Sequence, residues 1–165
     1  MKNKSINILI VSFLLLGIMA VILIAFLGEA KEDFPKNITV SEDGATESVL
    51  AVRELKLNPT ESKEYSVNLV CAATGSYHIY LDYEEKVDGG MKPFVDVSVK
   101  FDSEVVYEGE LAALLDGDEV IHFEDELHET ESLVVSICYL MPYDVGNEAQ
   151  GTYADFDIHL KIEKS

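Results

Sequence analysis

Two patterns of apolar and polar residues divide this chain into a leading segment and a longer remainder. Residues 6–27 run for 22 positions without a charged side chain. Over the remainder, apolar residues recur at every second position in runs separated by turn-forming residues. A period of two is typical of strands whose two faces meet different surroundings. The sequence therefore predicts one apolar helix followed by an all-β domain.

The alternating runs predict which side chains face a common core. Two segments, Val49–Leu57 and Leu133–Met141, are apolar on both faces, which favours central strands. Only Glu110–Leu115 has the character of a helix, of one or two turns. Seven or eight strands with turn residues between them predict an antiparallel β-sandwich of the jelly-roll or Greek-key type. The expected core side chains are Tyr65, Val67, Leu69, Cys71, Tyr77, Ile79, Leu81, Tyr83, Val95, Val97, Val99, Phe101, Ile121, Phe123, Phe156, Ile158, Leu160 and Ile162.

The leading segment predicts a single membrane-spanning helix. At about 1.5 Å per residue, a helix of this length covers about 33 Å, enough for a hydrocarbon core of about 30 Å. Lys2 and Lys4 precede the apolar run, whereas Glu29, Glu32 and Asp33 follow it, so the positive-inside rule keeps the N-terminus inside the cell. We expect a cytoplasmic N-terminus at residues 1–5, a transmembrane helix at 6–27, a juxtamembrane spacer at 28–48 with one short strand around Ile38–Val40, and an extracellular domain at 49–165.

A cleaved secretory signal is the alternative for the same segment. Gly28 and Ala30 are small residues spaced as in a cleavage site. The apolar run is longer than the roughly 7–15 residues of a signal's hydrophobic region, which favours a retained anchor. The expected location is therefore the cell membrane with the domain outside, and cleavage after Ala30 would instead release a secreted protein.

The segment after the anchor is strongly acidic. Residues 31–165 hold 30 Asp and Glu against 10 Lys and Arg, a net charge of −20. This charge repels the phosphates of nucleic acids and of anionic lipids, so we expect no nucleic-acid partner. Acidic outer faces also keep the edges of sheets from pairing at random.

No pattern typical of a catalytic site is present in the sequence. The His-Glu-x-x-His motif of zinc peptidases and the Gly-x-Ser-x-Gly elbow of hydrolases are both absent. His122 and His128 lie six residues apart in a strand-and-turn segment, and His78 and His159 are expected to point outward from separate strands. We therefore expect surface histidines, no catalytic residue and no cofactor.

Two further groups leave structural questions open. Asp116, Asp118 and Glu119 are the best candidates for Ca²⁺ ligands, although their spacing is not that of an EF-hand and the primary expectation is no metal. Cys71 and Cys138 leave a disulfide open in an exported domain. The alternation turns Cys71 toward the core and Cys138 toward solvent, which argues against a bridge unless the register slips.

Four segments of the C-terminal half form a further pattern: Val106–Leu111 (VYEGEL), Tyr139–Pro142 (YLMP), Asn147–Gly151 (NEAQG) and Ala154–Ile162 (ADFDIHLKI). Over about residues 50–162 the chain thereby resembles the TasA/camelysin family of exported Gram-positive proteins. Leu57-Asn58-Pro59 resembles the family's L-x-P-G turn, with Thr60 in place of the glycine.

The loop with Pro142, Asn147, Glu148, Gln150 and Gly151 has a structural rationale. Gly146 and Gly151 permit positive φ, and the amides of Asn147 and Gln150 can bond loop backbone groups. The loop would thereby deliver the last strand in a fixed register.

The resemblance implies a subunit of biofilm-matrix fibres, which assemble by donating an extended N-terminal segment to the next subunit's sheet. Leu27–Asp33 (LGEAKED) lacks the family's usual leader ending, and a retained helix would restrain that segment. We expect a membrane-anchored extracellular structural or interaction protein without catalytic activity. Its partners would be other copies or matrix proteins bound by strand addition, with Ile38–Leu57 as the donated segment. The alternatives are a camelysin-like metallopeptidase and a cation- or ligand-binding surface adhesin.

Overall fold

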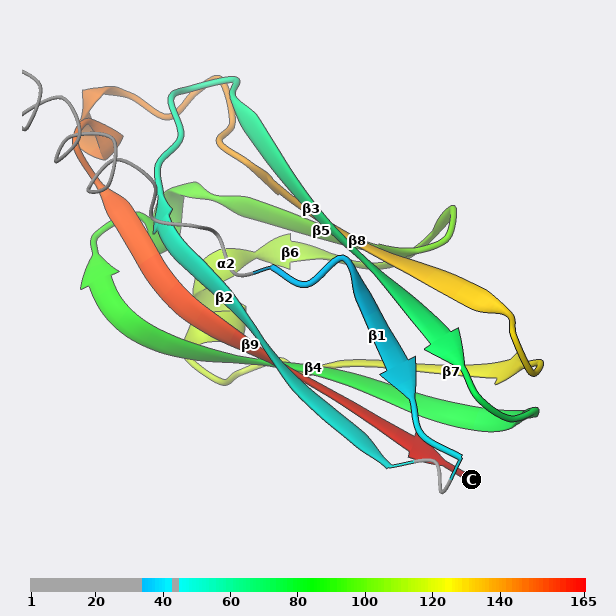
Figure 1. The fold of residues 1–165 in the computed structure, drawn as a ribbon. Helices are drawn as coiled ribbons and strands as arrows, with labels where there is room; N and C mark the ends of the chain where they lie inside the picture. The colour runs from blue at the N-terminus through cyan, green and yellow to red at the C-terminus, as the bar shows by residue number, and fades with distance from the viewer. Residues whose placement is uncertain (1–33, 43–44) are drawn as a thin grey trace, which may run out of the picture. The chain divides into compact units, whose positions relative to one another are not determined.

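The computed structural model describes residues 34–42 and 45–165, which form two β-sheets packed face to face (Figure 1). The all-β sandwich expected from the sequence is thus confirmed. The expected cytoplasmic residues 1–5 and membrane helix at 6–27 lie outside the described residues. Within 34–42 and 45–165, the structure has no helix long and apolar enough to cross a membrane.

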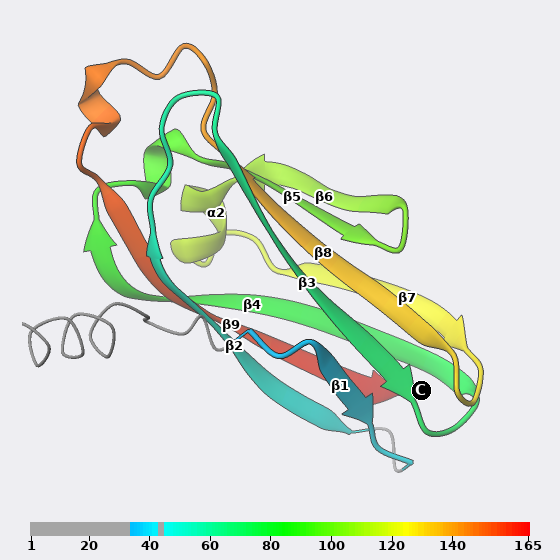
Figure 2. The same ribbon diagram turned by 45° about the horizontal axis from the view of Figure 1, so that its top comes forward.

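One sheet has five strands in the order β1-β3-β8-β5-β6, and the other has four in the order β2-β9-β4-β7 (Figure 2). β1 pairs with β3 in parallel, and the remaining pairs are antiparallel. The elements are β1 (Asn37–Val40), β2 (Thr46–Leu55), β3 (Ser62–Cys71), β4 (Gly75–Gly89), η1 (Lys92–Phe94), β5 (Asp96–Phe101), β6 (Glu104–Glu110), α2 (Leu111–Leu115), β7 (Ile121–Leu127), β8 (Ser132–Leu140), η2 (Asn147–Ala149) and β9 (Tyr153–Lys164). The short helix expected at Glu110–Leu115 is α2.

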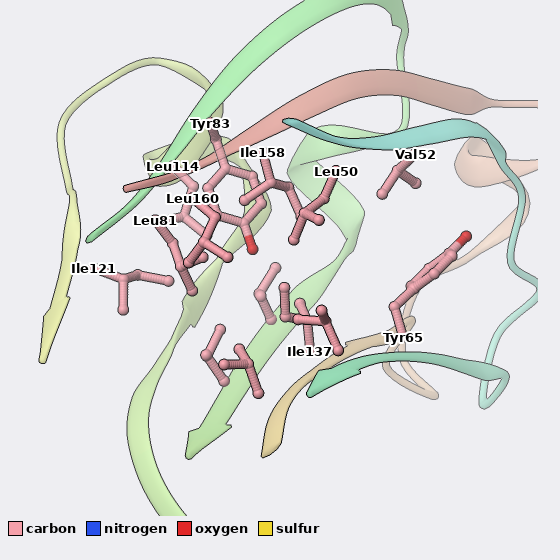
Figure 3. Packing of buried hydrophobic residues seen from close by; sticks show 14 of the residues in the cluster. Leu50, Val52, Tyr65, Leu81, Tyr83, Leu114, Ile121, Ile137, Ile158 and Leu160 are labelled. Carbon is pink, nitrogen blue, oxygen red and sulfur yellow. The ribbon is translucent and has the colours of Figure 1, made fainter. Parts of the chain in front are cut away.

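The two-residue period places one face of each long strand in a shared core. In the close-up, Leu50 and Tyr83 of the four-stranded sheet point toward Ile137 of the other sheet (Figure 3). Every side chain expected in the core is buried except Phe123, which is partly buried and stacks on Phe101 at 4.5 Å between ring centroids. Each fully buried aliphatic side chain contributes about 1.5–3 kcal/mol relative to an exposed one, so the alternation itself stabilises the sandwich.

The two apolar segments differ in where they lie. Leu133–Met141 was expected to be central, and β8 does lie in the middle of its sheet. The same expectation for Val49–Leu57 was wrong, because β2 is an edge strand and Val49 is 51% exposed. On the outer face of this sheet, Val49 lies with Tyr80 and Val120 among mostly polar side chains in the lining of a groove of about 670 Å³.

The sandwich begins before residue 49. β1 lies inside the stretch that the sequence assigned to a spacer, and its side chains at Ile38 and Val40 are buried. The short strand expected around Ile38–Val40 is therefore confirmed. β2 already begins at Thr46, so both segments belong to the folded unit.

Two tyrosine hydroxyls meet in the core between the sheets. The Oη atoms of Tyr83 on β4 and Tyr139 on β8 lie 3.5 Å apart. Both rings pack on Phe156, with centroid separations of 5.8 and 5.5 Å. Burial raises the pKa of both phenols, because a phenolate would lose its hydration there.

We expect this pair to make the fold sensitive to alkali. Both folded-state pKa values lie above the unfolded value of 10.0, so the unfolded chain releases these protons first. The contribution of the two protonated phenols to the free energy of unfolding is fully present below about pH 10 and is lost as the pH rises further. In urea denaturation between about pH 9 and 11, the Tyr83→Phe/Tyr139→Phe variant should lose less free energy of unfolding than the wild type. Tyr143→Phe, at a site 85% exposed, is the control and should behave as wild type. A double variant as alkali-sensitive as the wild type would contradict this account.

Candidate functional site

β1 is a short edge strand whose apolar side chains enter the core. Within residues 34–42 and 45–165 it pairs only with β3, with Thr39 opposite Val70 in the register. The amide of Asn68 donates to the carbonyl of Lys36 at 2.9 Å, and the amide of Ala72 donates to that of Val40 at 3.2 Å. If β1 left this position, β3 would expose an unpaired edge beside a slot for two side chains. Such an edge is what strand addition requires.

The loop expected to fix the last strand closes one end of the sandwich. It contains η2 and joins β8 to β9, close to the β2–β3 connection (Figure 1). The amide of Thr60 donates to the carbonyl of Met141 at 2.8 Å, and the amide of Met141 donates to that of Glu61 at 3.1 Å. The β8–β9 loop and the β2–β3 connection therefore form one structural unit. Pro142, Asn147, Glu148, Gln150 and Gly151 all lie in it.

The details of this loop differ from the expectation. Gly151 has a φ of 79°, but Gly146 has a φ of −77°, so only one of the two glycines uses positive φ. Among the described residues, the side-chain amides of Asn147 and Gln150 have no hydrogen-bond partner, whereas the backbone amide of Gln150 donates to the carbonyl of Asn147 at 3.1 Å. The loop is instead held by main-chain bonds and by the Thr152 hydroxyl, which donates to the Ala149 carbonyl at 2.7 Å.

The two glycines form a matched pair for mutagenesis. A Cβ at either position meets no heavy atom within 4 Å, so only backbone conformation distinguishes them. Gly151→Ala should lower the free energy of unfolding by about 1 kcal/mol, because an L-residue is strained at this φ. Gly146→Ala should be neutral or slightly stabilising. Chemical denaturation measures both, and equal effects would show that the Gly151 conformation is not needed.

The acidic turn after α2, which the sequence offered as a candidate for Ca²⁺ binding, contains an ion pair with a lysine. The Asp116 carboxylate accepts a hydrogen bond from Lys92 Nζ at 2.8 Å, and Lys92 also binds Glu85 at 3.1 Å. These two carboxylates raise the pKa of Lys92. Asp116, Asp118 and Glu119 do not bring three ligand atoms together, and the described residues form only one such group, which lies elsewhere.

The disulfide left open by the sequence does not form. Cys71 and Cys138 are both free. Cys138 lies opposite Glu64, seven residues along β3 from Cys71, which corresponds to roughly 23 Å. A bridge needs Cα atoms within about 7 Å. Burial raises the pKa of both thiols, which disfavours the reactive thiolate.

The structure brings together two histidines that the sequence placed on separate strands. His78 on β4 lies opposite Glu124 on β7, and His122 is the next outward residue of β7. His78 Nδ1 lies 3.2 Å from His122 Nε2 and 2.9 Å from Glu124 Oε1. His122 Nε2 lies 3.8 Å from the same carboxylate oxygen. We call these three residues the histidine cluster.

Aromatic stacking orients the rings of the histidine cluster. Tyr80, opposite His122 in the register, stacks on it with 4.6 Å between ring centroids and 12° between planes. His78 stacks on His122 at 5.4 Å and 19°. The three rings thus lie nearly parallel on the outer face of the sheet, and their side chains are fixed by one another.

The other two histidines lie outside the cluster. His159 on β9 contacts the Glu84 carboxylate at 2.9 Å, and Lys86 binds the same carboxylate at 2.6 Å. These contacts lower the pKa of Glu84. His128 follows β7, and six residues of strand separate it from His122 by roughly 20 Å. The pair considered in the sequence for a zinc site is therefore not brought together.

Only part of the histidine cluster could be predicted from the sequence. Alternation places His78, His122 and Glu124 on outward faces, as expected. The missing information was the pairing of β4 with β7 and its register, because segments whose histidines lie 44 positions apart can pair in many ways. A one-residue slip would turn one strand's outward side chains to the core.

Comparisons with known proteins give no family for this chain. No protein-family model matches it, and no curated protein matches it significantly. Dimeric latent PorU from Porphyromonas gingivalis is similar in structure with a TM-score of 0.33 and 10% identity over 82% of this chain. This chain spans only 14% of that protein. PliG from Salmonella Typhimurium, a periplasmic inhibitor of g-type lysozyme, has a TM-score of 0.31 and 14% identity over 78% of this chain and 98% of its own length.

Proposed function

We propose that this protein is a membrane-anchored extracellular structural or interaction protein of the TasA/camelysin type, without catalytic activity. The observation that carries the proposal is β1, a four-residue edge strand that inserts Ile38 and Val40 into the core. A strand of this kind near the N-terminal end can be exchanged between copies of the chain, or replaced by a strand from a matrix protein.

We also propose a jelly-roll topology for the sandwich. When β1 is set aside, the remaining eight strands pair as β2-β9-β4-β7 and β3-β8-β5-β6. The first of these strands thus pairs with the last, and the second with the second to last. This nested pairing supports a jelly roll, in which a folded hairpin of strands wraps into two sheets.

The proposed location rests on charge and on the apolar leading segment. Retention of residues 6–27 as an anchor would tether the acidic sandwich to the outer side of the membrane, whereas cleavage after Ala30 would release it. Retention would restrain the chain before β1 at the membrane, whereas cleavage would free it, so the two outcomes differ in how far the strand can reach.

The strand pairing supports a shorter donated segment than the one expected from the sequence. The range Ile38–Leu57 contains all of β2 and all of β1 except Asn37, and the two strands lie at the edges of different sheets. β2 pairs with β9 from Thr46 to Leu55 and buries Leu50, Val52 and Leu55. Removing β2 would open the core, whereas removing β1 withdraws only the side chains of Ile38 and Val40 from it. We therefore propose β1 as the exchanged strand.

A cysteine pair distinguishes a strand kept by its own chain from an exchanged one. Thr39→Cys and Val70→Cys face each other in the β1–β3 register. In the full chain in mild detergent, with Cys71 and Cys138 changed to serine, exchange should give a ladder of covalent oligomers on a non-reducing gel. A cross-linked monomer as the sole product would overturn strand exchange. Thr39→Cys alone, in the same background, is the control and should give no ladder beyond a dimer.

A second experiment tests the side chains that β1 inserts. Val40→Asp should abolish assembly measured by light scattering, because a carboxylate cannot enter the core slot without a large desolvation cost. Thr39→Asp adds the same charge at an exposed position of the same strand and should assemble as the wild type does. Equal assembly by both variants would show that β1 is not the contact.

The metallopeptidase alternative has one observation in its favour. His78, His122 and Glu124 offer a His₂Glu donor set, the same ligand types as in some zinc peptidases. Under this alternative, casein hydrolysis should be abolished by a chelator and by His122→Ala, but not by His128→Ala. The absence of hydrolysis in metal-loaded protein would remove it.

A further inference from the structure

The histidine cluster lies near one edge of the four-stranded sheet, open to solvent. The side chains of His78 and His122 are 31% and 40% exposed, and that of Glu124 is 63% exposed. β7 is the edge strand there, so no further strand covers the cluster on that side among the described residues. An ion can therefore reach the three ligand atoms without any opening of the fold.

The spacing of the ligand atoms fits tetrahedral coordination. With metal–ligand bonds of about 2.05 Å, neighbouring ligands of a tetrahedron lie about 3.3 Å apart. The three separations here are 2.9, 3.2 and 3.8 Å, which scatter around that value. The atoms His78 Nδ1, His122 Nε2 and Glu124 Oε1 would form one face of the tetrahedron, and a water molecule would occupy the fourth position.

Hydrogen bonding alone satisfies this triangle poorly. A neutral imidazole has one N–H, so His78 Nδ1 can donate a proton to Glu124 or to His122 Nε2, but it shares a single proton between them. A hydrogen on each of the two facing nitrogens would place two N–H donors head to head, with the nitrogens 3.2 Å apart. A cation at the centre instead binds a lone pair from all three atoms. The long-range field of the acidic domain favours the same outcome.

The donor types select the class of metal. Imidazole nitrogen suits Zn²⁺, Cu²⁺, Ni²⁺ and Co²⁺, whereas Ca²⁺ and Mg²⁺ prefer sets of six or more oxygens. We propose that His78, His122 and Glu124 bind one divalent transition-metal ion, with Zn²⁺ as the reference ligand. This goes beyond the proposed structural role and does not depend on strand exchange.

Zinc titration of the full chain in mild detergent tests the proposal. Calorimetry should show one Zn²⁺ per chain with micromolar affinity, weakened at about pH 5.5 because protons compete for the imidazole nitrogens. His122→Phe keeps an aromatic ring to stack on Tyr80 but removes the ligand nitrogen, and it should lower the affinity by at least about 100-fold. Glu124→Gln should lower it by about 10-fold.

The other two histidines are the matched controls. His128→Ala and His159→Ala remove the same type of side chain outside the cluster and should leave the Zn²⁺ affinity unchanged. No binding by the wild type, or equal weakening by the control variants and by His122→Phe, would overturn the proposal.

Nitrogen NMR of the wild-type histidine rings keeps the test independent of variant folding. Zn²⁺ should shift Nδ1 of His78 and Nε2 of His122 and leave the rings of His128 and His159 unmoved. Shifts confined to the latter two histidines, or spread equally over all four, would overturn the assignment.

Discussion

The burial of one face of β4 and β9 is the constraint on which the rest of the structure depends. These are the longest strands, they pair with each other through the middle of one sheet, and their inward side chains form the centre of the core. Because burial of each such side chain contributes on the order of 2 kcal/mol, any register that exposes them is strongly disfavoured. The register in turn fixes which outward residues become neighbours.

The outward face of the same sheet carries the polar chemistry of the domain. At one end Arg53 and Lys86 form ion pairs with Asp157, which is only 8% exposed. Lys86 also binds Glu84, and Glu84 in turn binds His159. At the other end lies the histidine cluster. Both groups consist of side chains at alternate strand positions, brought together across strands. The sheet therefore acts as a rigid support that holds ligand atoms at spacings set by the pairing of backbones rather than by flexible loops.

The sequence could predict the elements of the fold better than their arrangement. Alternation depends on each residue's own side chain and on its neighbours two positions away, so the buried faces of β3, β4, β5 and β9 were predictable. Partner choice depends on contacts between distant segments. For that reason Val49–Leu57, whose composition resembles a central strand, could not be assigned to an edge, and His78 could not be assigned to His122.

The same limit applies to the loops. Gly146 and Gly151 are the same residue type in the same loop, so the sequence does not distinguish them. Gly151 adopts positive φ because of the path that the chain takes from the loop into β9. Thr60 shows the reverse case, since it adopts a φ of 72° although it is not a glycine. A β-branched residue is strained in this conformation, and it is held there by the bond from its amide to Met141. The residue type thus sets which backbone conformations cost little free energy, whereas contacts between distant segments determine which conformation is adopted.

Strand exchange and metal binding, as proposed, use different sheets. β1 lies at the edge of the five-stranded sheet and its side chains enter the core, whereas the histidine cluster lies on the outer face of the other sheet. Exchange of β1 leaves β4 and β7, and hence the ligand atoms, in place. Conversely, an ion held by β4 and β7 makes no contact with β1 or β3. The two properties can therefore be present together in an assembled protein, and each copy in such an assembly would display its own metal site.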